Sequence, residues 1–206
     1  LDARADDAPL NSLTAPSGPV ADRRLTGDPA ARGAYATDDS ADTAWTTPFG
    51  HQVGATLTLP TNGQPIGELT ITQPTDDQHS TITSIRLTAG GTEVDVEVPA
   101  PDAAGASTVR LPTLLSTPRS ATALTLTVTA VDERTTIDRR FGEPTVLPVA
   151  IRDVRADALV RTVIGTPTGG CRSDLLTIDG QPVGLMIGDQ QAAALADGEA
   201  VHVTTC

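Results

Sequence analysis

The sequence predicts an all-β protein, an antiparallel β-sandwich with a small β-rich unit at its C-terminal end. In the middle of the chain, short segments carry apolar residues at every second position, with Thr or acidic residues between them. This alternation is typical of half-buried antiparallel strands. Turn-forming glycines and prolines separate the segments. No helical period lies between them, so a parallel α/β sheet is not expected.

The expected strands follow one another along the middle of the chain. They are GATLTLP (54–60), GELTIT (67–72), SIRLTA (84–89), TEVDVEV (92–98), STVRL (107–111) and ALTLTVTAV (123–131). Threonine suits the outer face of such strands because it is both β-branched and polar. The dipeptides Asn62-Gly63 and Gly90-Gly91 accept the positive φ of tight hairpin turns.

We expect three regions along the chain. Residues 1–25 form a partly ordered leader that could supply one edge strand, residues 26–160 form the sandwich, and residues 161–206 form the small C-terminal unit. A unit of about 45 residues buries too little apolar surface to be stably folded alone. The C-terminal unit is therefore expected to pack on the sandwich or against another part of a longer protein.

Within the C-terminal unit, LLTIDGQPVGLMI predicts a hairpin that turns at Asp179-Gly180. The segment DQQAAALADG predicts a short helix that is capped by Asp189 and ended by Gly198. The segment EAVHVTT predicts a strand with Val201 and Val203 on one face.

Composition argues against several kinds of partner. The net charge is -12 and all 14 cationic residues are arginine, without a basic stripe that would bind nucleic acid or an anionic membrane surface. No apolar run approaches the roughly 20 residues of a membrane helix, so direct membrane insertion is not expected. The chain begins at Leu1 and shows no signal peptide, so we expect it to be a piece of a longer protein.

The chain has two cysteines, Cys171 and Cys206. They are either free thiols or a disulfide. A disulfide is favoured, since nothing near them resembles the four nitrogen and sulfur ligands of a zinc site. A disulfide would indicate an oxidising compartment.

The loop Ala36-Thr37-Asp38-Asp39-Ser40-Ala41-Asp42-Thr43-Ala44-Trp45 precedes the first clear strand. It resembles the A-x-D-G-D-P-x-T-x-W signature of discoidin-like modules (factor V/VIII type C, galactose-binding-like). In that family the loop makes a tight turn that often wraps a structural Ca²⁺, and the Trp plugs one end of a jelly-roll core. Trp45 could also be an exposed platform for a sugar, although its position in the family favours the buried plug.

A more specific resemblance covers about residues 15–206. The segments GATLTLP, STITSIRLTAGG, ALTLTVTAV, GEPTVLPVAIRDV and the Cys-bounded ending GGCRSDLLTIDGQPVGLMI…DGEAVHVTTC occur in this order. They resemble the discoidin-like region of actinobacterial arabinofuranosyltransferases, large membrane glycosyltransferases that build cell-wall arabinan. The resemblance implies an extracytoplasmic module of a membrane-anchored enzyme whose catalytic acid lies in another part of that enzyme.

The resemblance implies a calcium site formed by Asp38, Asp42 and Asp153 together with carbonyls of the turn. Calcium takes six to eight oxygen ligands. However, Ser40 stands where the family has an Asp, and Asp153 stands where many members carry the longer Glu. The alternative is a metal-free turn in which the aspartates bond their own backbone amides.

Discoidin-like modules bind ligands through loops at one end of the sandwich. Two loops here combine the carboxylate, imidazole, guanidinium and aromatic groups that a sugar site needs. The candidate ligand-binding residues are Asp76, Asp77 and His79 in the loop 74–81, and Arg139, Arg140 and Phe141 in the loop 132–144. The alternative is that both are solvated loops without a ligand.

Three hypotheses follow for the function. The favoured one is a non-catalytic carbohydrate-binding-like module that binds arabinan-type glycan as part of a cell-wall arabinosyltransferase. The second is a structural or protein-interaction sandwich of the same large enzyme, and the third is an independent hydrolase. The third has little support, because Asp38/Asp39 and Asp76/Asp77 are sequence neighbours and adjacent strand residues point to opposite faces.

Overall fold

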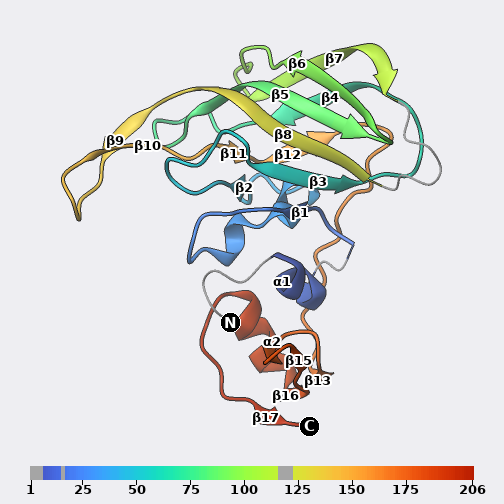
Figure 1. The fold of residues 1–206 in the computed structure, drawn as a ribbon, viewed down its shortest axis with the longest axis vertical. Helices are drawn as coiled ribbons and strands as arrows, with labels where there is room; N and C mark the ends of the chain where they lie inside the picture. Colours follow the sequence, from blue (N-terminus) through green and yellow to red (C-terminus); the bar gives the residue numbers. More distant parts are fainter. Residues whose placement is uncertain (1–6, 15–16, 116–122) are drawn as a thin grey trace.

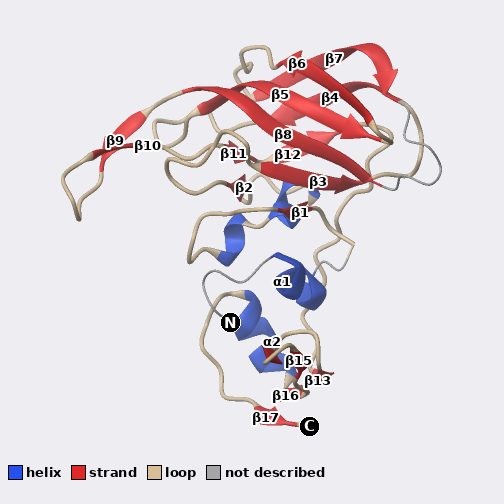
Figure 2. Cartoon of the chain, in the orientation of Figure 1, coloured by secondary structure: helices blue, strands red, loops and turns tan. Residues whose placement is uncertain are grey.

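The computed structural model of the chain describes residues 7–14, 17–115 and 123–206. A β-sandwich occupies the upper part of the molecule in Figure 1, and a smaller C-terminal unit occupies the lower part. Helix α1 (Asp7–Thr14) lies between them. Strands predominate over helices (Figure 2), which confirms the predicted all-β class.

Two antiparallel sheets enclose the core of the sandwich. The larger sheet has five strands in the order β1 (Val20–Ala21), β3 (Thr56–Pro60), β8 (Ala123–Asp132), β5 (Thr81–Ala89) and β6 (Thr92–Glu97). The smaller sheet has three strands in the order β12 (Asp153–Arg155), β4 (Ile66–Thr72) and β7 (Ala106–Leu115). A further antiparallel pair joins β2 (Trp45–Thr46) to β11 (Ala150–Ile151).

The core between the sheets is almost entirely aliphatic. It contains the alternate residues of the predicted strands, including Leu57, Leu59, Leu69, Ile71, Ile85, Leu87, Val109, Leu124, Leu126 and Val128. Burying one such side chain stabilises the fold by about 1.5–3 kcal/mol. The period-two pattern therefore predicted both the strands and the face of each strand that is buried.

The two predicted turn dipeptides have different roles. Gly90 and Gly91, with φ of 56° and 83°, connect β5 to β6 as a tight hairpin. Gly63 also has a positive φ of 82°, but it lies between β3 and β4, which belong to different sheets. The Asn62-Gly63 turn therefore carries the chain from one sheet to the other and does not close a hairpin.

The N-terminal region contains more regular structure than the sequence predicted. Strand β1 pairs with β3 at the edge of the larger sheet. Helix α1 was not expected, and neither were the two 3₁₀ helices η1 (Pro29–Ala31) and η2 (Gly33–Thr37). Such short helices are stable only through tertiary packing, so local sequence gives little sign of them. Residues 1–6 and 15–16 of the leader lie outside the described residues.

The predicted loop 132–144 is mostly a hairpin. Strand β9 (Thr135–Ile137) pairs with β10 (Pro144–Val146), and the two form an arm that extends away from the sandwich (Figure 1). At its tip, the Asp138 carboxylate accepts a hydrogen bond from the Arg140 amide at 2.7 Å. We call this hairpin the β9–β10 arm.

The C-terminal unit contains two small sheets and one helix. Strands β13 (Gly170–Arg172), β16 (Leu185–Ile187) and β17 (Thr204–Thr205) form one sheet, and β14 (Thr177–Ile178) and β15 (Gln181–Pro182) form the predicted hairpin. Asp179 and Gly180 have φ of 51° and 76°, which confirms the turn. The strand predicted around Val201 and Val203 is wrong, because only Thr204 and Thr205 pair, opposite β16.

Helix α2 (Asp189–Ala196) confirms the predicted helix, but its cap differs from the prediction. Gly188 precedes the helix, and its amide donates to the Gln191 side chain at 2.7 Å. The Asp189 carboxylate instead accepts from the Gly169 amide at 2.6 Å. Gly198, with φ of 82°, follows the helix as predicted.

The C-terminal unit packs against α1. Leu13 of α1 shares a small apolar core with Ile187, Ala192 and Leu195. The contact is reinforced by a hydrogen bond of 2.7 Å from the Arg172 guanidinium to the Ser12 hydroxyl. Among the described residues, no helix is both long and apolar enough to cross a membrane.

Cys171 and Cys206 form a disulfide, as predicted. The bond links β13 to the residue after β17, at a sequence separation of 35. In the chain-entropy model, a closed loop of this length stabilises by roughly 3–4 kcal/mol. Because β17 is only two residues long, we expect the bond to hold it in place.

We therefore expect the double change Cys171→Ser and Cys206→Ser to destabilise the C-terminal unit by roughly 3–4 kcal/mol. The measurement is amide hydrogen exchange in α2, which should accelerate. The sandwich, followed through the fluorescence of its single Trp, should keep its unfolding midpoint. Unchanged protection of α2 would contradict the prediction.

Candidate ligand-binding site

Trp45 closes one end of the sandwich core. Its side chain is fully buried, at 0% exposed, and belongs to the main hydrophobic core. Its indole N–H donates to the backbone carbonyl of Arg23 at 3.0 Å. The buried-plug interpretation is thus confirmed, and the exposed sugar platform is wrong.

The acidic loop before Trp45 is closed by its own hydrogen bonds. The Asp38 carboxylate accepts from the Ser40 amide at 3.1 Å and from the Thr43 hydroxyl at 2.8 Å. The Ser40 hydroxyl accepts from the Asp42 amide at 3.2 Å. Both oxygens of Asp38 are therefore used within the turn.

Asp153 lies on β12, and arginines surround its carboxylate. It is bonded to the Arg155 guanidinium, and it accepts from Arg161 at 2.7 Å. The same two arginines also bond Asp39 of the acidic loop, at 2.8 Å and 2.7 Å. Asp39 adopts a left-handed φ of 65°, an uncommon conformation for a residue with a side chain. Two guanidinium groups thus link the loop to the last strand of the sandwich.

The residues present do not fit the calcium ion that the family resemblance implies. Asp38 is occupied by its own turn, Asp153 already has two cationic partners, and Asp42 is exposed on the surface of the loop. Within 7–14, 17–115 and 123–206, no three His, Cys, Asp or Glu residues gather as a possible ligand set. Calcium needs six to eight oxygens, and the guanidinium groups supply the positive charge here instead.

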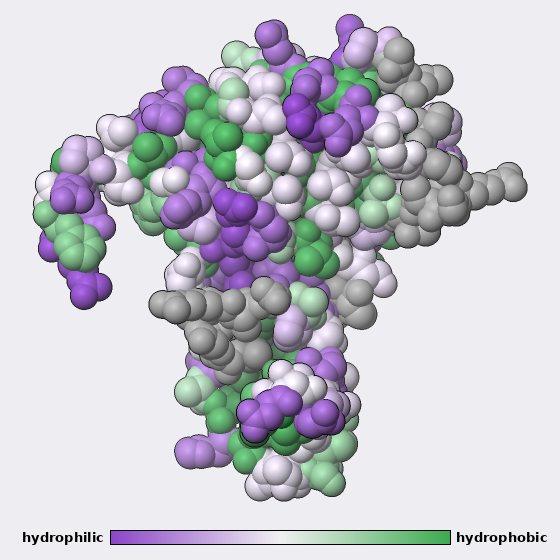
Figure 3. Space-filling view, in the orientation of Figure 1, coloured by the Kyte–Doolittle hydropathy of each residue, from purple (hydrophilic) through white to green (hydrophobic). Residues whose placement is uncertain are grey.

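A groove of about 710 Å³ lies between the β9–β10 arm and the end of the sandwich. Figure 3 shows the body hollowed beside the arm. The part of the loop 74–81 that lines it consists of Asp77, Gln78 and His79. The arm contributes residues 135–139 and Thr145 to the groove. Phe49 and Asp28 line it as well, from outside the arm.

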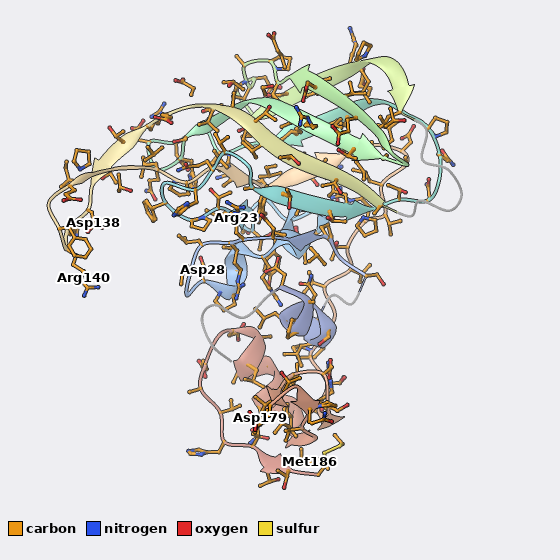
Figure 4. All side chains as sticks on the ribbon, in the orientation of Figure 1. Arg23, Asp28, Asp138, Arg140, Asp179 and Met186 are labelled. Atoms are coloured by element: carbon orange, nitrogen blue, oxygen red, sulfur yellow. A yellow bond between two sulfur atoms is a disulfide. The ribbon has the colours of Figure 1, made fainter. Side chains whose placement is uncertain are left out.

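The structure brings part of the predicted ligand site together. Asp77, His79 and Arg139 all line this groove. Arg140 and Phe141 do not. They lie at the tip of the arm, where Phe141 is 67% exposed and the Arg140 guanidinium lies 5.2 Å from the Phe141 ring centre. In Figure 4, Arg140 lies at the tip of the arm, apart from Asp28.

Hydrogen bonds within the loop 74–81 fix its polar groups. The Asp76 carboxylate contacts Nδ1 of His79 at 2.8 Å and accepts from the Gln78 amide at 2.9 Å. The Asp77 carboxylate accepts from the Arg134 guanidinium at 2.5 Å, and its side chain remains exposed. Asp76 therefore orients His79, while Asp77, Gln78 and His79 are the residues of this loop that line the groove.

The pKa of the Asp76 carboxyl is lowered. Partial burial raises it, but the hydrogen bonds from His79 and the Gln78 amide, with the charges of His79 and Arg152, lower it by more. The carboxylate thus stays ionised at neutral pH and accepts from Nδ1–H of His79. The other ring nitrogen, Nε2, is then an acceptor in the neutral imidazole.

Sequence reasoning missed several groove residues. Phe49 is 44% exposed and is the aromatic ring that lines the groove. Asp28 caps η1 by accepting from the Ala30 amide at 2.8 Å, and it also reaches the groove. Phe49 and Asp28 are distant in sequence from both predicted loops, and only folding brings them together with His79. The one usable signal was that Phe49 follows the Trp45 loop closely.

Two antiparallel sheets, a buried Trp and a groove beside the β9–β10 arm make the chain a two-sheet β-sandwich module. No protein-family model matches the chain, and neither does any curated protein. Similarity is found at the level of solved structures. The arabinofuranosyltransferase AftD from mycobacteria matches over 98% of this chain, with a TM-score of 0.60 and 21% sequence identity.

A mutant of the same enzyme matches over 96% of this chain, with a TM-score of 0.58 and 21% identity. The chain spans only 16% of the length of AftD. The family 32 carbohydrate-binding module of NanJ from C. perfringens, solved with galactose, matches 68% of this chain and 96% of its own length, with a TM-score of 0.46 and 17% identity. The chain thus has the fold of a segment of AftD, as the sequence resemblance implied.

Proposed function

We propose that this chain is a non-catalytic carbohydrate-binding-like module of a larger cell-wall arabinosyltransferase. In this proposal it binds an arabinan- or arabinogalactan-type glycan on the outer side of the membrane. The observation that supports it most is the groove beside the β9–β10 arm, where Asp77, His79 and Arg139 lie with Phe49.

The groove has the chemistry that a neutral sugar requires. Arg139 can donate paired hydrogen bonds to neighbouring hydroxyls, and Asp77 and Nε2 of His79 can accept them. Phe49 supplies an apolar face for the C–H side of a sugar ring. The volume of the groove, about 710 Å³, is typical of ligand sites. With a single ring in the groove, we expect weak binding.

The proposed setting rests on the fold and the disulfide. The likeness in fold to a segment of AftD supports a place within a larger, membrane-anchored enzyme, whose remaining part would be the direct partner. The disulfide suits an oxidising, extracytoplasmic compartment. The alternative function is a structural or protein-interaction sandwich in the same enzyme, without glycan affinity.

We propose no catalytic role for the groove acids. A glycosidase general acid needs a raised pKa, whereas the pKa of Asp76 is lowered. Asp77 already forms an ion pair with Arg134.

The test is a calorimetric titration of the chain with arabinan oligosaccharides. We expect the double change Phe49→Ala and Arg139→Ala to weaken binding at least tenfold, since it removes a charged donor worth about 1.5–3 kcal/mol and the apolar face. Arg110→Ala is the matched control, because this exposed arginine on β7 is outside the groove. It should bind as the parent does.

Two further conditions make the test specific. Because the ligand is neutral, affinity should depend little on salt. Because the described aspartates do not gather into a ligand set, we expect titrations in EDTA and in calcium to agree. If arabinan oligosaccharides show no binding at all, the structural alternative replaces this proposal.

A further inference from the structure

A second, smaller hollow adjoins the groove. Its volume is about 370 Å³, and the acidic loop (41–44), η1, Pro74 and Arg152 line it. Three residues, Asp28, Thr46 and His79, line both the groove and this hollow. The two depressions are therefore neighbours with a common wall, at the end of the sandwich that Trp45 closes from inside.

Arg152 is held at this hollow by its backbone. It lies between β11 and β12, and its amide donates to the Thr72 carbonyl on β4 at 2.8 Å. Its guanidinium makes no hydrogen bond within the part of the chain that the structure describes. Its positive charge nevertheless contributes to the lowered pKa of Asp76, so it lies near the Asp76–His79 pair.

Asp42 provides a second polar group at the hollow. Its backbone amide is bonded to the Ser40 hydroxyl, which fixes the residue in the loop. Its carboxylate is exposed and forms no ion pair among the described residues. The hollow is thus lined by a guanidinium and a carboxylate that form no hydrogen bond or ion pair with another side chain among the described residues, and each residue has a hydrogen-bonded backbone amide.

We propose that the hollow is a second sugar subsite, and that groove and hollow together bind a glycan chain of at least two sugar units. Arg152 and Asp42 contact the second unit, and His79 lies between the two units. This inference rests on the proposed function of the groove. It adds that the ligand is recognised as a chain and not as a single sugar.

The charge balance favours a neutral polyhydroxyl ligand over an anion. Asp28 and Asp42 line the hollow together with Arg152 and His79, which is bonded to Asp76, so its acids outnumber its guanidinium groups. An anion would be repelled there. Alternating donors and acceptors match the vicinal hydroxyls of a sugar. No Phe, Tyr or Trp side chain lines the described wall of the hollow, so we expect hydrogen bonds to provide the contact.

The experiment compares ligand lengths. The chain is titrated with methyl arabinofuranoside, an arabinan disaccharide and an arabinan tetrasaccharide. We expect the disaccharide to bind about tenfold more tightly than the single sugar, the gain of one or two charge-assisted hydrogen bonds. Arg152→Ala should remove this gain and leave the affinity for the single sugar unchanged. Asp42→Asn should reduce the gain in part.

Controls separate this inference from the function on which it rests. Arg139→Ala should weaken all three ligands alike, and Arg110→Ala should weaken none. The native fluorescence of Trp45 confirms that each variant is folded. Equal affinity for all ligand lengths, or a length dependence that survives Arg152→Ala, would overturn the second subsite and leave the groove intact. If no ligand binds, both proposals fail.

Discussion

Replacing Trp45 with alanine should lower the free energy of unfolding by about 3–5 kcal/mol, as large core truncations do. The ring is fully buried, and its neighbours are aliphatic residues that can fill only part of the cavity left behind. The change also removes the hydrogen bond from the indole to the Arg23 carbonyl. The effect is measured by urea unfolding. Circular dichroism is the signal, because the variant has no Trp left whose fluorescence could be followed.

Phe49→Ala is the matched control for this change. Phe49 lies four positions after Trp45 but is 44% exposed, so its loss should cost far less stability. The parent protein should also show the blue-shifted emission of a buried indole. An unfolding midpoint that is equal in the Trp45 variant and the parent would refute the plug.

The second large effect is expected at Asp7, where Asp7→Ala should destabilise the protein by about 3–5 kcal/mol. The carboxylate is buried and accepts hydrogen bonds from the amides of Gly33 at 2.8 Å and Ala21 at 3.3 Å. It also forms an ion pair with Arg24 at 3.4 Å. These contacts attach α1 to η2 and to strand β1.

The reason for so large an effect is the charge that remains. Arg32 is 0% exposed, and its Nε and Nη1 have no hydrogen-bond partner among the described residues. Its one hydrogen bond there goes from Nη2 to the Tyr35 hydroxyl at 2.8 Å. Without Asp7, this buried guanidinium loses a nearby compensating charge, and two buried amides lose their acceptor.

Asp7→Asn separates the contribution of the charge from that of the hydrogen bonds, because it keeps an acceptor oxygen and removes the charge. We expect the free energy of unfolding of Asp7→Asn, measured by urea unfolding, to lie between those of the parent and of Asp7→Ala. Burial raises the pKa of Asp7 above its usual value, against the opposing effects of the Gly33 and Ala21 amides and the arginines. A raised carboxyl pKa means that protonation favours the folded state.

The parent should therefore gain stability relative to Asp7→Asn as the pH falls through the raised pKa of Asp7 toward its ordinary value of about 4. This gain in stability from protonation of Asp7 reaches its full size only below the pKa of Asp7 in the unfolded chain. Glu199→Ala, which removes an exposed acid from the C-terminal unit, serves as the control without such an effect. Equal stability of the Asp7→Ala variant and the parent would contradict the role assigned to Asp7.

The candidate site was only partly predictable from sequence. Asp77, His79 and Arg139 were identified because their loops mix several polar groups, and the fold brings them into one groove. The sequence predicts Phe141 as the apolar face because it shares the loop 132–144 with Arg139 and Arg140. Phe141 lies at the tip of the β9–β10 arm and does not line the groove, whereas Phe49, some ninety positions earlier, lines the same groove as Arg139.

The acidic loop shows the same limit. Its resemblance to a calcium-binding turn is a matter of residue types and spacing. In the structure, Asp39 of this loop and Asp153 of β12 are bonded by Arg155 and Arg161, which follow the loop by more than a hundred positions in sequence. The sequence of residues 36–45 alone does not predict these arginine partners.

By itself, the sequence determined the strands, the buried face of each strand, the Gly90-Gly91 and Asp179-Gly180 turns, and the Cys171–Cys206 pair. These features depend on period-two burial, on backbone conformations local to two residues, or on the only two cysteines of the chain. Tertiary structure alone decided the docking of α1 through Asp7, the pairing of Asp39 and Asp153 with arginines, and the joining of groove and hollow at His79. Each of these depends on charges or hydrogen bonds between residues distant in sequence, and their geometry exists only after the sandwich has closed.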